Sequence, residues 1–312
     1  MAAQAADPIV IDAAGVRGRL TYAAAIPVVR EAMIALSDGR VRQHLRSFIG
    51  LGEGRTFAIM PAALSAGGVF GAKLVSVFHD GTGRKAHEGL VVIFDGDTGA
   101  PVCLADAAEV TAIRTAAASA VATEALAATG ARSLAILGLG KQALAHLEAL
   151  RLVRDLDDIR VWGRDLVRAQ AFADHHGLRA CQTVAEAVDG AEIICTVTGA
   201  ADPILEGRLV SPGAHVNAVG SSGPGQAEID SDLVARSRFI VDHREHVLAH
   251  GGEFLRSGLP ADHIAAEIGE VLAGAKAGRT AADQITVYKS LGHAAQDLAV
   301  TDWLHRQKDK RP

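Results

Sequence analysis

A glycine-rich turn at residues 138–143 constrains the fold of this chain more than any other feature. The apolar run at residues 133–137 leads into Gly138-Leu-Gly140-Lys-Gln-Ala143, and an amphipathic segment follows. This is the pattern G-x-G-x-x-A between a strand and a helix. Gly138 permits a tight turn, Gly140 lets a pyrophosphate approach the backbone, and Ala143 lets the helix pack closely on the strand. The free N–H groups at the helix start can bind the anion, so the turn predicts a dinucleotide site.

The next predicted strand, residues 159–162, indicates which dinucleotide binds. NAD sites usually place a carboxylate at the end of this strand, where it holds the ribose 2′-hydroxyl. Here the strand ends in Gly163-Arg164, and Arg168 follows one helical turn later. Arginine forms charge-assisted bidentate bonds with phosphate, so the two guanidinium groups favour the 2′-phosphate of NADP(H). The alternative is a solvated helix start capped by Asp165, and NAD(H) then stays open as the cofactor.

The chain after residue 120 alternates predicted strands and helices, which is typical of a doubly wound parallel sheet of the Rossmann type. We expect its strands at residues 133–137, 159–162, 192–197, 214–219 and 238–242. We expect the helices between them at residues 141–153, 165–176 and 183–189. The fold class is therefore α/β, with a dinucleotide-binding domain over residues 121–295.

The chain before residue 120 has a different pattern and predicts a β-rich α+β domain. A helix at residues 21–36 precedes strand-like runs at residues 41–49, 55–60, 69–78, 90–95 and 101–104. Short glycine-containing links between successive strands favour an antiparallel sheet. An alanine-rich helix at residues 107–129 connects the domains, and a last helix from residue 293 returns to the first. The first domain then comprises residues 1–120 and 296–312.

The composition limits the classes of partner. The chain has 312 residues, of which 49% are hydrophobic and 21% charged, with a formal net charge of −5. This balance gives no reason to expect binding to nucleic acid or to a membrane. Three scattered cysteines and no secretory leader predict a reducing compartment, the cytoplasm. His243, His246 and His250 fall on one helical face without a zinc-protease arrangement, so we expect a solvated helix start and no metal site.

Three cations of the first domain are candidates for chemistry. Lys73 lies in the run 69–78, which is apolar on both faces, and burial lowers a lysine pKa toward the range where it transfers protons. Arg114 lies among small residues and is suited to holding a carboxylate or a phosphate. Arg46 is a second candidate for holding a carboxylate. The alternatives are an outward-pointing Lys73 on an edge strand and an exposed Arg46 on a half-buried strand.

Several motifs along the chain have the spacing of one known family. They are Met60-Pro61 and the segments at residues 71–77, 86–90, 94–101, 111–119, 138–146, 217–220 and 289–292. The most specific are Arg-Thr-Ala-Ala-x-Ser, which begins at Arg114, and Gly-x-Gly-x-Gln-Ala-x-x-His, which begins at Gly138. On these motifs the chain resembles the ornithine cyclodeaminase/μ-crystallin family over most of its length.

The resemblance implies a homodimer whose first domain binds substrate and forms the dimer interface. It also implies action on small α-amino or α-imino acids with NAD or NADP. By position, Arg46, Lys73 and Arg114 hold the substrate carboxylate, and Lys73 and Ser222 are the catalytic residues. The turn and the resemblance together predict cofactor contacts at His87, Arg114, Thr115, Gly138, Gly140, Lys141, Gln142, Gly163, Arg164, Arg168, Thr196, Val197, Thr198, Val219, Gly220, Ser290 and Gly292.

Ser222 decides the predicted activity within that family. Cyclodeaminases carry an aspartate in the matching loop, whereas residues 219–225 here read Val-Gly-Ser-Ser-Gly-Pro-Gly. A hydroxyl supplies no negative charge to orient a distal ammonium, so the serine favours the reductase branch. The expected reaction is NADPH-dependent reduction of Δ1-pyrroline-2-carboxylate or Δ1-piperideine-2-carboxylate to proline or pipecolate. The alternatives are an alanine- or opine-type dehydrogenase, a non-catalytic crystallin-like ligand-binding protein, and ornithine cyclodeamination through another carboxylate, Glu88 or Asp297.

Overall fold

The computed structural model describes residues 7–65, 67–78 and 87–307, except for the side chain of His87. The chain divides into two compact units, residues 1–114 with 293–312 and residues 115–292. The boundaries expected from the sequence, after residue 120 and before residue 296, lie a few residues further along. Helix α3 (Ala107–Leu126) runs through the first boundary without a break, so the connection between the units is helical.

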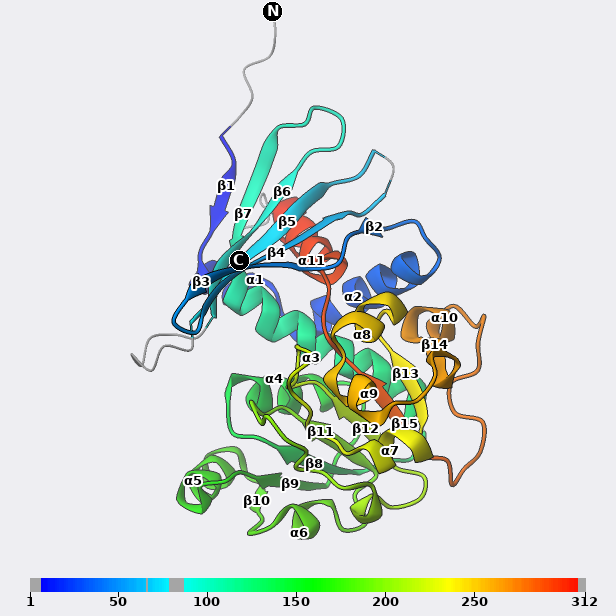
Figure 1. Cartoon of the computed structure of the whole chain (residues 1–312). Coiled ribbons are helices and arrows are strands. Elements are labelled where there is room, and N and C mark those ends of the chain that lie inside the picture. The colour runs from blue at the N-terminus through cyan, green and yellow to red at the C-terminus, as the bar shows by residue number, and fades with distance from the viewer. Residues whose placement is uncertain (1–6, 66, 79–86, 308–312) are drawn as a thin grey trace, which may run out of the picture. The chain divides into compact units, whose positions relative to one another are not determined.

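Within the described residues, the first unit forms a seven-stranded sheet (Figure 1). Its strands are β1 (Ile9–Ile11), β2 (Arg42–Gln43), β3 (Ser47–Gly52), β4 (Arg55–Ala63), β5 (Phe70–Phe78), β6 (His87–Phe94) and β7 (Pro101–Asp106). They follow the order β1-β7-β6-β5-β4-β2, and β3 also pairs with β4. Every pairing among these strands is antiparallel except that of β1 with β7. The expected, mainly antiparallel sheet is confirmed.

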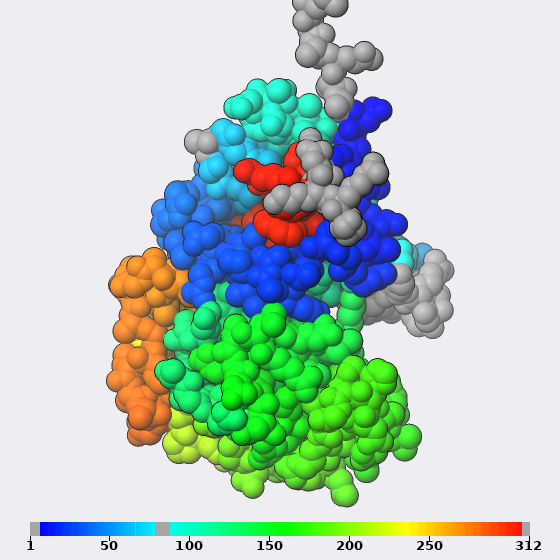
Figure 2. All heavy atoms as spheres, turned by 180° about the vertical axis from the view of Figure 1, so that it is seen from behind, coloured from blue at the N-terminus to red at the C-terminus, as the bar shows by residue number. Residues whose placement is uncertain are grey.

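Helices of the first unit cover this sheet. Helix α11 (Ala294–Arg306) packs across strands β4 to β7, and α2 (Tyr22–Ser37) packs beside it. In Figure 2 the blue spheres of the N-terminal helices lie against the red spheres of α11. Helix α1 (Ala13–Arg19) packs on β1 and β7. The last helix, α11, therefore packs on the sheet of the first unit.

Within the described residues, the second unit contains an eight-stranded sheet in which all pairings are parallel. Its strands are β8 (Ser133–Leu137), β9 (Asp158–Trp162), β10 (Arg179–Ala180), β11 (Ile193–Thr196), β12 (His215–Ala218), β13 (Arg238–Val241), β14 (Ile264–Glu267) and β15 (Thr286–Lys289). Their order is β10-β9-β8-β11-β12-β15-β13-β14. The strand order therefore reverses between β8 and β11, which is where an open α/β sheet binds its ligand. The Rossmann-type fold class is confirmed.

The helices of the second unit alternate with its strands. They are α4 (Lys141–Leu150), α5 (Leu166–His176), α6 (Val184–Val188), α7 (Ser231–Arg236), α8 (Arg244–His250), α9 (Gly252–Ser257) and α10 (Ile268–Leu272), with short 3-10 turns η1 (Gly207–Leu209) and η2 (Ala261–His263). Asp165 caps α5 by accepting from the backbone N–H of Arg168, and Gly177 ends it in the left-handed conformation. These end signals are local, which explains why α5 was predictable.

Two sequence expectations concern the described helices. No single helix in the described residues has the length and hydropathy of a membrane span; α1 and α2 meet that test only when taken together, and they meet at 91°. The solvated helix start predicted around His246 is wrong, because His246 is buried with 2% of its surface exposed. Its ring packs edge-on against that of His243, the N-cap of α8.

Candidate active site and cofactor site

The turn after β8 has the geometry that a dinucleotide requires. Gly138 has a φ of +136°, and a Cβ there would lie 2.7 Å from the carbonyl oxygen of Val197. Gly140 is the N-cap of α4, and no described atom lies within 4 Å of the position that its Cβ would take. The backbone at the start of α4 is therefore open, and its N–H groups fit a pyrophosphate.

A buried histidine holds the first turn of α4. His146 lies between the carbonyl oxygen of Gln142, 2.8 Å from Nδ1, and the hydroxyl of Ser119, 2.8 Å from Nε2. Burial lowers the pKa of His146 to about 4, so the ring is neutral. Nδ1 then donates to Gln142 and Nε2 accepts from Ser119, which assigns a structural role to the last residue of the glycine-turn motif.

The turn after β9 leaves both readings of cofactor preference open. Arg164 and Arg168 are exposed, which suits a 2′-phosphate, and Asp165 caps α5 with its Oδ1 3.1 Å from the backbone nitrogen of Arg168. Gly163 packs closely against the glycine turn, because a Cβ there would lie 2.3 Å from Cδ1 of Leu139. Leu139 belongs to the glycine turn, so the two turns contact each other directly.

The carboxyl ends of β11 and β12 are joined by a carboxylate that sequence reasoning missed. Glu228 is fully buried and accepts hydrogen bonds from Thr196, Thr198 and Gly220, three of the predicted cofactor residues. Burial raises the pKa of Glu228, while its bonds with Thr198 and the nearby Lys289 oppose that rise. Val197 and Val219, both predicted cofactor residues, are buried beside these bonds.

The end of β15 is fixed in a similar way. Oδ2 of Asp242 accepts from the backbone nitrogens of Leu291 and Gly292, at 2.7 and 2.6 Å. Gly292 has a φ of +73°, which favours glycine there, and the backbone of Ser290 donates to Ala218 of β12 at 3.0 Å. The structure therefore brings the predicted residues Ser290 and Gly292 to the same sheet edge as Gly220.

An ion pair beneath this edge supports the loop that carries Ser222. Lys289 and Glu253 are both fully buried, and Nζ of Lys289 lies 2.9 Å from Oε2 of Glu253. Nζ also donates to the carbonyl oxygen and the hydroxyl of Ser221, each at 2.8 Å, and Ser221 donates to Oε1 of Glu253 at 2.5 Å. Ser222 follows this anchored residue and is exposed.

The first unit holds a second cluster of buried charges. Lys73 lies on the central strand β5 opposite Met60 and Val91, on the buried face of the sheet. Oδ1 of Asp297, on α11, lies 3.3 Å from Nζ of Lys73 and 2.9 Å from Nε of Arg114. One carboxylate therefore serves two cations, and Lys73 does not point outward from an edge strand.

Neutral partners complete the contacts of this cluster. The hydroxyl of Thr111 accepts from Nζ of Lys73 at 2.5 Å, and Oε1 of Gln296 accepts from Nη1 of Arg114 at 3.0 Å. Burial lowers the pKa of Lys73 to about 8; Asp297 opposes the shift, and Arg114 and the half-buried Arg46 add to it. Lys73 therefore changes its charge near neutral pH, as a proton donor should.

The remaining predicted residues are less informative. The side chain of His87 lies outside the described residues, although its backbone belongs to β6. Thr115 is buried, Lys141 is exposed, and Gln142 is half-buried. Glu88, one alternative carboxylate for cyclodeamination, is exposed. The other, Asp297, is already engaged by Lys73 and Arg114.

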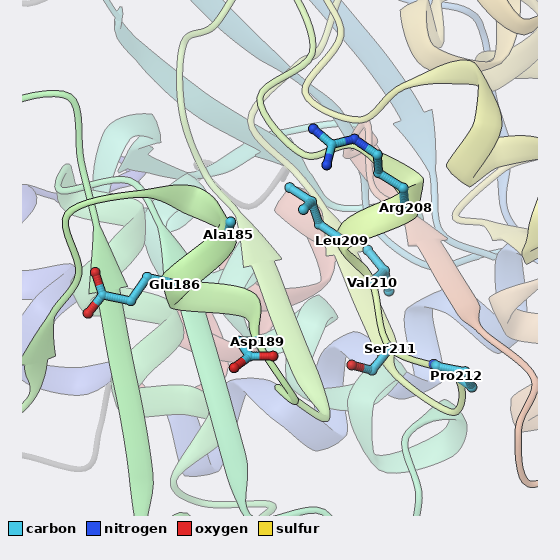
Figure 3. A pocket seen from close by; sticks show the side chains of 8 residues that line it. All are labelled: Ala185, Glu186, Asp189, Arg208, Leu209, Val210, Ser211 and Pro212. Atoms are coloured by element: carbon cyan, nitrogen blue, oxygen red, sulfur yellow. The ribbon is translucent and has the colours of Figure 1, made fainter.

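A surface depression in the second unit is not part of this site. It is lined by residues of α6, η1 and the turn after η1, namely Ala185, Glu186, Asp189, Arg208, Leu209, Val210, Ser211 and Pro212 (Figure 3). Asp189 precedes β11 and Pro212 precedes β12, so the depression lies at the amino ends of these strands, away from the glycine turn. Glu186 is paired with Arg179 and Arg208 with Glu206, so the two charged groups of the depression do not form one binding site.

Comparison with models of protein families identifies the family of this chain. The model of the ornithine cyclodeaminase/mu-crystallin family matches residues 6–310. The chain belongs to this family. The resemblance expected from the motifs is therefore confirmed over nearly the whole sequence.

Three members of this family or its structural neighbours illustrate the similarity. Ketimine reductase mu-crystallin of Mus musculus is 39% identical over 281 residues, which cover 88% of each chain. The structure of Thermococcus litoralis Delta(1)-pyrroline-2-carboxylate reductase in complex with NADH and L-proline aligns with a TM-score of 0.89 and 29% identity over 96% of both chains. An archaeal alanine dehydrogenase dimer with bound NAD aligns with a TM-score of 0.90 and 27% identity, over 96% of this chain and 95% of that one.

These relatives are reductases and dehydrogenases of the ornithine cyclodeaminase/mu-crystallin family or its fold. The predicted enzyme class, a nicotinamide-dependent oxidoreductase, is confirmed by them.

The buried acids Glu228, Glu253 and Asp242 were missed because nothing in the local sequence indicates their partners. An acid inside an apolar segment was the available signal, as at Ala-Glu-Ile around Glu228.

Proposed function

We propose that this protein reduces a cyclic imino acid, Δ1-pyrroline-2-carboxylate or Δ1-piperideine-2-carboxylate, to proline or pipecolate with NADPH. The observation that carries this proposal is the charge imbalance in the first unit. Lys73 and Arg114 are buried around the single carboxylate of Asp297, with Arg46 nearby. Buried cations in excess of anions attract an anionic ligand, and the substrate carboxylate is such a ligand. Similarity to a ketimine reductase and to a pyrroline carboxylate reductase supports the choice.

The cluster assigns roles to individual atoms. The described residues engage Nε and Nη1 of Arg114 and leave Nη2 for one carboxylate oxygen of the substrate. Arg46 binds the other oxygen, and Lys73 donates a proton to the imine nitrogen, which makes the C=N carbon a better hydride acceptor. When bound, NADPH supplies the hydride to that carbon. The product is the cyclic amine, and Lys73 regains its proton from solvent.

Ser222 separates this reaction from ornithine cyclodeamination. A cyclodeaminase needs a carboxylate near the substrate nitrogen, and Ser222 offers a neutral hydroxyl. Asp297 is held by two cations and Glu88 is exposed, so neither replaces that carboxylate. Ser222 instead hydrogen-bonds the substrate nitrogen or the nicotinamide amide in our proposal.

NADPH is preferred in this proposal because two exposed arginines, Arg164 and Arg168, follow β9. Arg164→Ala should raise the KM for NADPH about tenfold or more while changing that for NADH little, since a charge-assisted bond to phosphate is lost. Arg208→Ala, an exposed arginine paired with Glu206, is the matched control. Equal losses for both cofactors would remove the role of Arg164 at the 2′-phosphate.

The reaction is tested by following NADPH absorbance with Δ1-pyrroline-2-carboxylate, beside an NADH control. Turnover that disappears in Lys73→Ala supports the proposal. Release of ammonia and proline from ornithine and NAD would overturn it. NADPH binding without turnover of any cyclic imine or keto acid would favour a ligand-binding protein instead.

A second candidate comes from the archaeal alanine dehydrogenase neighbour. That reaction begins with a keto acid and ammonia, so its diagnostic is NAD(P)H oxidation by pyruvate that depends on added ammonium. The cyclic imine needs no ammonium. Leaving ammonium out of the assay therefore separates the two candidates.

We also propose a cytoplasmic homodimer, with the interface on the first unit. Strand β3 pairs only on the side of β4 in the described residues, and its Phe48, Ile49 and Leu51 are each about half exposed. An exposed apolar strand of this kind is a pairing surface. Light scattering should give twice the chain mass, and Ile49→Glu should shift it toward the monomer. A wild-type monomer at micromolar concentration would overturn the dimer.

A further inference from the structure

Glu228 occupies an unusual position in the second unit. It follows the loop after β12, and its carboxylate reaches back to the carboxyl ends of both β11 and β12. Oε2 accepts from the hydroxyl of Thr196 at 2.8 Å and from the backbone nitrogen of Gly220 at 2.5 Å. Oε1 accepts from the backbone nitrogen and the hydroxyl of Thr198, at 2.5 and 2.7 Å. One side chain therefore binds two separate loops through four hydrogen bonds.

The chemistry of this position calls for a carboxylate. The backbone N–H groups of Thr198 and Gly220 can only donate, and each bonds a different oxygen of Glu228. A glutamine would direct its NH₂ group at one of these two donors, and neither can accept. A buried donor facing a donor is costly, so the amide breaks one side of the bridge.

The two loops are packed too closely to rearrange freely. A Cβ on Gly220 would lie 2.1 Å from the carbonyl oxygen of Thr198, and Gly220 also donates to the carbonyl oxygen of Thr196 at 3.1 Å. Behind the bridge, the backbone nitrogen of Glu228 donates to Oε1 of Glu253 at 3.2 Å, and Glu253 pairs with Lys289. The carboxylate thus belongs to a buried network that joins the two loops to the Glu253–Lys289 ion pair.

The strand order indicates which half of the cofactor these loops receive. The glycine turn follows β8 and holds the pyrophosphate. The arginine-bearing turn follows β9, on one side of β8, and so receives the adenosine half. Strands β11 and β12 lie on the other side of β8, where the nicotinamide half must extend.

We infer that Glu228 is a positioning residue for the nicotinamide half of the cofactor: it fixes the Thr198 and Gly220 loops without touching the cofactor itself. The inference rests on the proposed nucleotide binding. It predicts that loss of the bridge weakens binding of the whole cofactor and leaves binding of its adenosine half unchanged.

The test is calorimetric titration of Glu228→Gln with NADPH and with adenosine 2′,5′-bisphosphate, which lacks the nicotinamide half. The Kd for NADPH should rise about tenfold or more, as expected for a misplaced buried acceptor. The Kd for the bisphosphate should stay within about twofold of the wild-type value. An equal rise for both ligands, or none for either, would overturn the inference.

Glu192 provides a matched control at the opposite edge of the same sheet. Its Oε2 accepts from the backbone nitrogens of Arg132 and Ser133 and from the Ser133 hydroxyl, at the amino end of β8. Glu192→Gln and Glu228→Gln should both lower the melting temperature, but Glu192→Gln should leave the Kd for NADPH unchanged. Weaker NADPH binding in both variants would mean that Glu228 only stabilises the fold.

The test has a substitute variant and a substitute ligand pair. If Glu228→Gln does not fold, Glu228→Asp replaces it, since the shorter carboxylate cannot reach both loops. If the wild-type protein prefers NADH, then NADH and adenosine 5′-monophosphate form the ligand pair. A wild-type protein that binds neither nicotinamide cofactor overturns the proposed function and this inference together. Wild-type binding with no selective loss in the variant overturns only the inference.

Discussion

Two buried lysines, one in each unit, meet opposite electrostatic conditions. Lys289 donates to the carbonyl oxygen and the hydroxyl of Ser221 and forms an ion pair with Glu253, a carboxylate that pairs with no other described cation. Lys73 has two described contacts, with Thr111 and Asp297, and Asp297 is shared with Arg114. A buried lysine with a carboxylate of its own stabilises structure, whereas one in a cation excess is suited to bind and react.

The largest expected effect is on catalysis by Lys73. Lys73→Met should lower kcat/KM for the cyclic imine by about 10²–10⁴-fold, since the proton donor is lost. The melting temperature should hold or rise, because the variant removes one of the cations that share Asp297. Steady-state kinetics and thermal unfolding measure the two effects. Lys276→Met, at an exposed lysine, is the control and should change neither.

For Lys289 we expect a loss of stability instead. Lys289→Met should lower the free energy of unfolding by about 3–5 kcal/mol, because Glu253 is left buried without its cation. The double variant Lys289→Met/Glu253→Met should recover most of this loss. Urea unfolding of the three proteins measures it. A single variant as stable as the wild type would show that the pair contributes nothing.

The pH dependence of the reduction should report Lys73. In the proposed mechanism the ammonium is the proton donor, and burial lowers the pKa of Lys73 to about 8, so the active form is present below that pH. The rate of imine reduction should therefore be level up to about pH 8 and fall about tenfold per unit above it. Oxidation of the cyclic amine needs the neutral form of Lys73 to accept the proton, so the rate of that reaction should rise through the same pH range. A flat profile between pH 7 and 10 would exclude Lys73 as the donor.

The smallest expected effect distinguishes the roles of Asp297 and Glu253. Asp297 opposes the lowering of the Lys73 pKa, so Asp297→Asn should move the alkaline limit of reduction to lower pH by about one unit. Glu253→Gln should reduce stability and leave the limit in place, because Glu253 pairs with Lys289 in the other unit. An unmoved limit in Asp297→Asn would mean that Asp297 only packs the cluster.

The glycine turn and the strands around it were predictable because their signals are local. Gly138 and Gly140 follow an apolar strand directly, and Asp165 and Gly177 mark the two ends of α5. The burial of Lys73 also followed from the apolar residues on both sides of its strand. Strands β10, β14 and β15 were missed. β10 has only two residues, too few for a periodicity to be recognised, whereas β14 and β15 are as long as the predicted β11, β12 and β13, so length does not explain why they were missed.

The partners of the charged residues were not predictable in the same way. Lys73 and Asp297 are separated by 224 positions, and Thr196 and Glu228 by 32. A sequence indicates that a buried charge needs a partner, but folding decides which one. From the sequence, Asp297 is a candidate only for contact with a substrate nitrogen. In the structure its carboxylate accepts hydrogen bonds from Lys73 and Arg114.

The contact between Gly163 and Leu139 has a consequence for how cofactor preference can evolve. An acidic residue that selects NAD would stand at position 163, but its Cβ would fall 2.3 Å from Cδ1 and 2.5 Å from Cγ of Leu139. An acid at 163 therefore requires the Leu139 side chain to move or to be replaced by a smaller one. The two positions are therefore coupled, because the side chain at one limits the room for a side chain at the other.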